Sequence, residues 1–149
     1  MVRVSAWLLF FMLMTVSCLD EPDCYSLNNY IVGIGFKKIA TSRADTVVFN
    51  SVTTAEPPLL FYDSAAFSRI VLPLNYFQDE TTFYFQEEDT VRFLRLGYTS
   101  QPQFVSENCG ERFVLSNLRV LQHSFDSVRL VHDVPSRNGD GVNHIEIFR

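Results

Sequence analysis

The sequence is short of several features that would place it in a familiar class. Its 149 residues carry 12 basic and 17 acidic side chains, a net charge of −5, so it lacks the basic surplus that binding to a phosphate backbone requires. Six glycines and six prolines are too few for a collagen, and a charged fraction of 19% is too low for a coiled coil. Hydrophobic residues make up 47% of the chain, which excludes disorder. We expect one globular domain and no nucleic-acid partner.

Short catalytic motifs are also missing. There is no GxSxG elbow for a nucleophilic serine, so Ser106 and Ser116 are interpreted as loop residues. The GIG triplet at residues 33–35 lacks the spacing and the helix of a phosphate-binding loop. No nucleophile, base and orienting group can be named together, so we expect neither enzyme activity nor a cofactor.

Histidines and carboxylates do not follow the spacings of common metal sites. The histidines are His123, His132 and His144, and the acidic groups are Asp20-Glu21, Asp79-Glu80, Glu87-Glu88-Asp89 and Asp140. The histidines form neither HxH nor HExxH, and the acids do not follow the order of an EF-hand loop. We expect structural histidines, solvated acidic turns and no metal. Convergence of His132 and His144 across a final hairpin is the alternative.

The first 17 residues form a separate segment. Arg3 is the only charged residue before Asp20, and residues 4–16 are almost wholly apolar. Such a run gives about 20 Å of helix, and a lasting transmembrane helix needs about 20 apolar residues. A basic start, a short apolar core and small residues are typical of a secretory signal peptide. We therefore assign residues 1–17 to a signal peptide, followed by an acidic tether at residues 18–27.

Thr15-Val16-Ser17-Cys18 resembles the lipobox of bacterial lipoprotein signals, although that motif usually has Leu where Thr15 stands. In such signals the cysteine is acylated and becomes the mature N-terminus. Acyl chains contribute roughly 0.8 kcal/mol per buried CH₂, so several chains hold a protein on a bilayer. We expect Cys18 to be a lipid anchor in a membrane of the cell envelope. Cleavage without lipidation is the alternative.

The chain has three cysteines, so they cannot all pair with one another in disulfides, as the cysteines of an exported protein usually do. If Cys18 carries lipid, Cys24 and Cys109 remain, and a disulfide between them would persist in an oxidising compartment. Closing so long a loop contributes about 4–5 kcal/mol in chain-entropy models. A reactive thiol at Cys109 and two reduced, buried thiols are the alternatives.

From Tyr30 onward, apolar residues recur mostly with period two, which is typical of β-strands. The pattern predicts eight or nine short strands and no amphipathic helix of normal length. The expected fold is an all-β antiparallel sandwich, immunoglobulin-like or related, in one domain over residues 28–149. The β-like runs are 30–37, 46–52, 59–62, 70–75, 81–86, 90–98 (which resumes at 103–106 after an interruption at Pro102), 112–115 with 118–122, 128–134 and 142–148.

Four local features refine this expectation. Gly33 and Gly35 leave one face of the first strand small, so another segment is expected to approach it closely. Pro73 places its strand at a sheet edge or at a strand end. The apolar phase shifts within residues 90–98, which suggests a bulge. Residues 136–141 carry the strongest turn signal of the chain, with glycines suited to positive φ.

Aromatic and arginine side chains offer surface alternatives. Residues 18–149 contain 12 phenylalanines and six tyrosines but no tryptophan, and the whole chain has ten arginines and two lysines. The tyrosines (Tyr25, Tyr30, Tyr62, Tyr76, Tyr84 and Tyr98) could form a face that stacks on carbohydrate, but half-buried packing is the expected role. The strand arginines (Arg92, Arg95, Arg119 and Arg129) are expected to pair with carboxylates on outer sheet faces, with a protein partner as the alternative.

Several short motifs occur in an order that resembles a known family. They are Cys18, Cys24, Ile70-Val71-Leu72-Pro73-Leu74-Asn75, Thr82-Phe83-Tyr84-Phe85, Cys109-Gly110 and His144-Ile145-Glu146-Ile147. The arrangement resembles a family of small Bacteroidota lipoproteins that is catalogued as a domain of unknown function, number 6452. The resemblance covers most of the mature chain. It implies a β-rich envelope lipoprotein without an assigned activity, and it makes Cys24 and Cys109 the family's paired cysteines by position.

Together these features predict a lipid-anchored, disulfide-stapled β-sandwich in a bacterial envelope. Its place is the outer membrane, on the periplasmic face or the cell surface. The expected role is binding, or service as an accessory to an envelope assembly with a protein partner. A glycan- or small-ligand-binding module is the alternative.

Overall fold

The computed structural model describes residues 29–55, 58–137 and 141–149. These residues form ten β-strands and no helix, which confirms the all-β class. The strands are β1 (Tyr30–Lys37), β2 (Val47–Thr54), β3 (Leu60–Phe67), β4 (Arg69–Pro73), β5 (Glu80–Glu87), β6 (Thr90–Ser106), β7 (Gly110–His123), β8 (Ser127–Leu130), β9 (Ser136–Arg137) and β10 (Ile145–Phe148). The predicted signal peptide, lipid-bearing Cys18 and tether lie outside the described residues.

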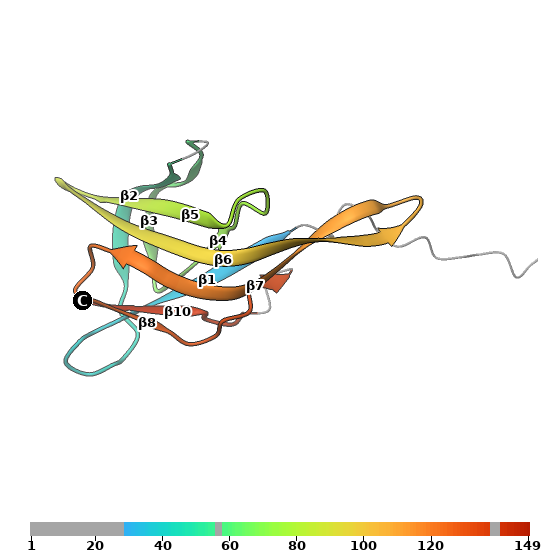
Figure 1. Cartoon of the computed structure of the whole chain (residues 1–149). Helices are drawn as coiled ribbons and strands as arrows, with labels where there is room; N and C mark the ends of the chain where they lie inside the picture. The colour runs from blue at the N-terminus through green and yellow to red at the C-terminus, as the bar shows by residue number, and fades with distance from the viewer. Residues whose placement is uncertain (1–28, 56–57, 138–140) are drawn as a thin grey trace, which may run out of the picture.

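Two five-stranded sheets pack face to face as a sandwich (Figure 1). Sheet A has the order β4-β1-β10-β8, and β9 also pairs with β1. Sheet B has the order β3-β2-β5-β6-β7. The predicted antiparallel sandwich is confirmed, with one exception. The last strand of the chain, β10, lies beside the first, β1, and runs parallel to it. The short strand β9 brings the number of strands to ten.

The core lies where alternate side chains of the two sheets meet. Val32, Ile34 and Phe36 of β1 are fully buried, as the period-two pattern predicts. Phe49 of β2 bridges the sheets, because its ring centroid lies 5.3 Å from that of Phe36 and 5.2 Å from that of Phe85. Each such side chain stabilises the fold by roughly 1.5–3 kcal/mol through burial.

The small face of β1 is covered closely, as predicted. Arg69 of β4 donates from Nη2 to the carbonyl oxygen of Val142 at 2.8 Å and from Nε to Oδ1 of Asn143 at 2.9 Å. A Cβ added to Gly33 would lie 2.2 Å from that carbonyl oxygen, and one added to Gly35 would lie 2.5 Å from the Asn143 amide nitrogen. Glycine at these two positions therefore lets the segment before β10 lie directly on β1.

The prediction for Pro73 is confirmed, because β4 ends at Pro73 and forms an edge of sheet A. β8 and β10 pair antiparallel, but they do not form the predicted hairpin, because β9 lies in their connection and pairs with β1. Gly141 has a φ of 77°, in line with the predicted turn, whereas residues 138–140 lie outside the described part.

The apolar phase shift in β6 has another cause than the predicted bulge. β5 and β6 pair without interruption. Leu94 and Leu96 are buried, whereas Val91 is exposed and Phe93 is half-buried on the opposite face. Register shifts do occur, but between β6 and β7, first at Arg95. The apparent phase shift therefore arises because apolar residues lie on both faces of β6, first on the outer face and then on the inner face. The pairing of β6 with β5 stays regular.

β6 and β7 continue past the sandwich as a two-stranded arm, defined here as residues 98–116 (Figure 1). β5 pairs with β6 only as far as Gly97, and beyond it β6 pairs with β7 alone. None of residues 99–114 is buried. The expected break at Pro102 is absent, because β6 has a neighbour on one side only at this point and such an edge tolerates proline.

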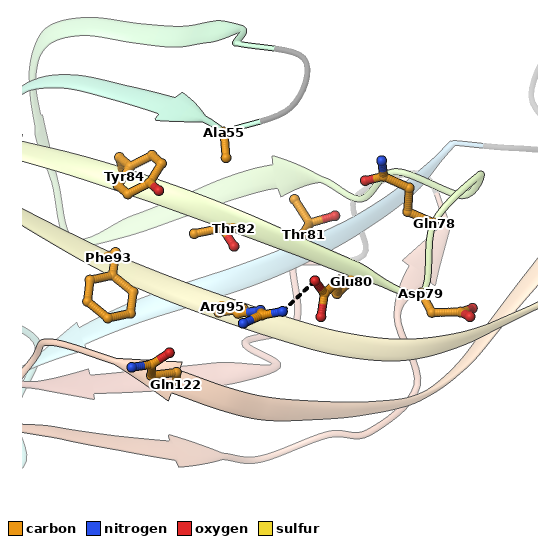
Figure 2. Close-up of a pocket in the computed structure, with 10 residues that line it drawn as sticks. All are labelled: Ala55, Gln78, Asp79, Glu80, Thr81, Thr82, Tyr84, Phe93, Arg95 and Gln122. Carbon is orange, nitrogen blue, oxygen red and sulfur yellow. Dashed lines mark hydrogen bonds and ion pairs between the residues drawn. The ribbon is translucent and has the colours of Figure 1, made fainter.

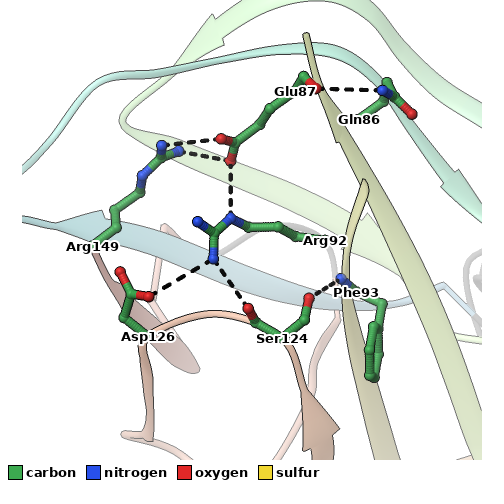
Figure 3. A network of polar contacts seen from close by, with 7 residues as sticks. All are labelled: Gln86, Glu87, Arg92, Phe93, Ser124, Asp126 and Arg149. Carbon is green, nitrogen blue, oxygen red and sulfur yellow. Dashed lines mark hydrogen bonds and ion pairs between the residues drawn. The ribbon is translucent and has the colours of Figure 1, made fainter. Parts of the chain in front are cut away.

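Charged side chains close the sandwich at the end opposite the arm (Figure 3). Arg149, which follows β10, donates two hydrogen bonds to the carboxylate of Glu87, at 2.9 and 3.1 Å. Arg92 Nε lies 3.8 Å from the same carboxylate, and Arg92 Nη1 donates to the Ser124 carbonyl oxygen at 3.0 Å. The cluster therefore ties the C-terminal end of sheet A to the β5–β6 turn of sheet B.

Candidate functional site

The outer face of sheet B is hollowed over β5, β6 and β7 (Figure 2). The hollow has a volume of about 630 Å³. Its lining residues are Ala55, Gln78, Asp79, Glu80, Thr81, Thr82, Tyr84, Phe93, Arg95 and Gln122. Aromatic, charged and amide side chains share one depression here, and we take it as the candidate binding site.

Strand pairing sets the arrangement of these side chains. Tyr84 of β5 lies opposite Phe93 of β6. Thr82 lies opposite Arg95, which in turn lies opposite Gln122 of β7. Opposed residues on one face of a sheet have Cβ atoms about 5 Å apart. The hollow therefore presents an aromatic row next to a polar row. The burial pattern of β5 alternates, which turns Thr82 and Tyr84 outward.

The polar row carries a charge pair that a ligand can reach. Arg95 Nη2 donates to Glu80 Oε1 at 2.5 Å, and both side chains are exposed by more than a third. An ion pair this exposed contributes at most about 1 kcal/mol to stability. Its donors and acceptors can thus be redirected to a ligand at little cost. Asp79 is held in place because its Oδ1 accepts from the Ser100 backbone N–H at 3.3 Å.

A buried hydrogen-bonded network supports the hollow from behind. The Tyr98 hydroxyl donates to the Asn75 carbonyl oxygen at 2.7 Å and lies 2.6 Å from Thr81 Oγ1. Thr81 Oγ1 also accepts from the Asn75 backbone N–H at 3.3 Å. Burial of the phenol raises the pKa of Tyr98 to about 12, so the hydroxyl stays protonated at neutral pH. The network anchors the loop that carries Gln78 and Asp79.

The predicted tyrosine face does not form as a group. Tyr84, with 38% of its surface exposed, is the one tyrosine of the described chain that lines the hollow. Tyr25 lies outside the described residues. The others are buried or half-buried: Tyr30, Tyr62, Tyr76 and Tyr98. The sequence analysis did not identify Phe93 as the partner of Tyr84. If Leu94 and Leu96 are taken to face the core, the alternation along the strand places Phe93 on the outer face.

The strand arginines divide between two environments. Arg95 forms the pair described above and Arg129 pairs with Glu146, so outer-face pairing is confirmed for both. Arg119 forms no ion pair with the described residues. Arg92 also pairs with carboxylates, those of Glu87 and Asp126, but the prediction of an outer face is wrong for it. Its guanidinium lies 5.7 Å from the ring centroid of the buried Phe125. Arg92 lies on the face of β6 that points toward the core, at the end of the strand where the core ends.

His144 is buried, and both of its ring nitrogens have partners. Nδ1 accepts from the Gly33 backbone N–H at 3.0 Å, and Nε2 lies 2.9 Å from Ser136 Oγ. The ring of His132 does approach, with 6.4 Å between ring centroids. His123 Nδ1 lies 3.0 Å from a backbone carbonyl oxygen. Among the described residues, no group of three His, Cys, Asp or Glu side chains could hold a metal ion.

The predicted acidic turns have separate roles. Asp79 and Glu80 line the hollow, and Glu87 belongs to the closing cluster. Asp20-Glu21 and Asp140 lie outside the described residues. The prediction that Ser106 and Ser116 are loop residues is wrong, because Ser106 ends β6 and Ser116 lies within β7. Ser106 Oγ accepts from the Cys109 backbone N–H at 3.1 Å, and Ser116 pairs within the arm.

The cysteines are only partly described. Cys109 lies at the tip of the arm and is disulfide-bonded. Cys18 and Cys24 both lie outside the described residues, so the pairing of Cys24 with Cys109 stays a prediction. In the part of the chain that the structure describes, there is no helix with the length and apolar character needed to span a membrane.

Comparison with known proteins identifies a family. Residues 38–149, about three quarters of the chain, match the model of a family of unknown function, DUF6452. The matched region starts directly after β1 and includes the other nine described strands, the hollow and the arm. No curated protein and no solved structure matches the chain. The chain therefore belongs to the DUF6452 family of unknown function.

Proposed function

We propose that this protein is a lipid-anchored binding protein of the bacterial envelope that takes a carbohydrate in the hollow of sheet B. The observation that carries the proposal is the aromatic row of Tyr84 and Phe93 beside the polar row of Arg95 and Gln122. A sugar ring has an apolar C–H face and a rim of hydroxyl groups, so it matches a surface that offers both.

The size and chemistry of the hollow support this ligand class. Its volume of about 630 Å³ falls in the range of roughly 300–1,000 Å³ that small-ligand sites occupy. Arg95 and Gln122 provide several N–H donors, and Glu80 provides carboxylate acceptors for hydroxyl groups. The hydroxyl groups of Thr82 and Tyr84 both donate and accept. No bond has to be broken for such a ligand to bind, so the proposal requires no catalytic group.

The anchor part of the proposal rests on the N-terminal sequence. Residues 1–17 have the features of a signal peptide, and Cys18 stands where the lipobox places its acylated cysteine. The resemblance to Bacteroidota lipoproteins supports a location at the outer membrane. The disulfide between Cys24 and Cys109 belongs to the same proposal, because export provides the oxidising compartment that it needs.

Binding to a panel of soluble oligosaccharides, measured by calorimetry, tests the hollow. We expect Tyr84→Ala to weaken binding about tenfold, since one aromatic contact is worth about 1.4 kcal/mol. Phe104→Ala is the matched control, because it removes an exposed ring from the arm and leaves the hollow intact. Equal binding by both variants would contradict the proposed site. If no sugar binds and an envelope protein is recovered with the wild-type chain instead, the role is that of a protein-binding accessory.

Fractionation of cells tests the anchor. The Cys18→Ala variant should leave the membrane fraction and lose acyl labelling, because it has no thiol to modify. Ser17→Ala keeps a small residue before the cysteine and should remain in the membranes. Membrane retention of Cys18→Ala would rule out the lipid as the anchor.

A further inference from the structure

The arm places one exposed aromatic side chain far from the core. β6 runs nine residues past the end of its pairing with β5, which corresponds to about 30 Å of strand. Phe104, near the end of this extension, has 66% of its surface exposed. Cys109 lies in the turn that closes the arm, with its backbone N–H bonded to Ser106 Oγ. The arm thus carries an exposed ring and a disulfide-bonded cysteine at the same end.

The length of chain between the cysteines limits where this end can be. Cys24 is six residues from Cys18 in the sequence, a distance of at most about 20 Å when the chain is fully extended. A lipid on Cys18 and a disulfide from Cys24 to Cys109 would therefore hold the tip of the arm within about that distance of the bilayer surface. The opposite end of β6, at the β5–β6 turn, lies about 50 Å further along the strand.

We propose that the tip of the arm (residues 103–111) rests on the anchoring membrane, with Phe104 inserted among the lipid headgroups. This inference rests on the proposed function, because it takes the lipid on Cys18 and the Cys24–Cys109 bond as given. The tip carries two carboxylates, from Glu107 and Glu111, and the guanidinium of Arg112 directly follows it. A nearly neutral lipid surface therefore suits it better than a strongly anionic one.

The proposed contact sets the orientation of the whole molecule. The arm stands between the membrane and the sandwich, so sheet B is held away from the bilayer. The hollow lies on the part of β5–β7 beyond the base of the arm. It therefore faces the aqueous space next to the membrane and not the bilayer itself. A carbohydrate of the cell wall or cell surface could enter it without displacing lipid.

Tryptophan fluorescence tests the contact, because residues 18–149 contain no tryptophan. A Phe104→Trp variant of the lipidated protein has a single reporter at the tip, and its exposed position makes the change compatible with folding. Val91→Trp is the matched control, since Val91 is also exposed and lies on the same strand, about 40 Å away. Both are reconstituted in vesicles of phosphatidylethanolamine with a small share of phosphatidylglycerol, with and without brominated acyl chains.

We expect brominated lipid to cause a loss of emission from Phe104→Trp and no loss from Val91→Trp. Flotation of the vesicles is measured in the same samples. If the protein floats but the two variants lose emission equally or not at all, the contact is overturned while the anchor stands. If the protein does not float, the anchor fails, and the inference fails with it.

Discussion

The buried phenol of Tyr98 couples the stability of the fold to alkaline pH. Its pKa is about 12 in the folded protein, above the ordinary value of 10, so the folded state holds the phenolic proton more tightly than the unfolded state. The corresponding stability is complete below pH 10 and is lost as the pH rises to about 12. Urea unfolding should show this loss in the wild type, and Tyr98→Phe should show a smaller one. Parallel losses in the two proteins would contradict the assignment.

A second single-residue effect concerns the glycines of the strands. Gly33→Ala would place a methyl group against the Val142 carbonyl oxygen, which is backbone and cannot move aside. We expect it to lower the free energy of unfolding by about 3 kcal/mol. Gly97→Ala is the matched control: its methyl group would lie 3.0 Å from Leu121 Cδ1 and 3.1 Å from Arg119 Nε, both on flexible side chains.

The control should change stability by no more than about 0.5 kcal/mol. Chemical denaturation of the two variants, under identical conditions, provides the comparison. If Gly97→Ala were as damaging as Gly33→Ala, the close approach to β1 would not be the reason that glycine is needed there.

Between elements, the closing cluster joins the two sheets through a single carboxylate. Glu87 faces the guanidinium groups of Arg92 and Arg149, and removing its charge would leave two like charges close together. We expect Glu87→Gln to lower stability by about 2 kcal/mol, since the pair is only partly buried. Glu88→Gln removes the same charge from the exposed neighbouring position and should have little effect. Similar melting temperatures for the two variants would argue against the cluster as a link between sheets.

The strands themselves could be predicted because the burial pattern is local. Alternation of Val32, Ile34 and Phe36 with smaller or polar residues marks both the strand and its buried face. The same reasoning failed for β6, where Val91 and Phe93 are apolar but face outward. An apolar side chain on an outer face has the same hydropathy as one in the core, so hydropathy alone could not assign it.

At the scale of the whole molecule, the predicted disulfide between Cys24 and Cys109 would connect the arm to the N-terminal segment. Mass spectrometry of the exported protein, digested without reduction, should find Cys24 joined to Cys109. The bond should contribute about 4 kcal/mol, because it closes a loop of more than 80 residues. A Cys24 thiol that reacts freely with an alkylating reagent before reduction would exclude this pairing.

The candidate site shows where prediction from sequence ended. Tyr84 was among six candidate tyrosines, and Arg95 among four candidate arginines, but their common location was not apparent. Glu80 had been assigned to a solvated acidic turn, and Gln122 had not been singled out. The hollow depends on residues from three strands, from Glu80 to Gln122, that are up to 42 positions apart, and no local pattern specifies such a set.

The sequence by itself determined the class of the protein: a β-rich body, and inward faces marked by period two. Each of these follows from the order of neighbouring residues. Only the tertiary structure decided that β10 lies parallel to β1, that β6 and β7 leave the sandwich as an arm, and that Tyr84 meets Phe93. The reason is that strand pairing and register arise from the packing of distant segments against one another, and many pairings satisfy the same local pattern.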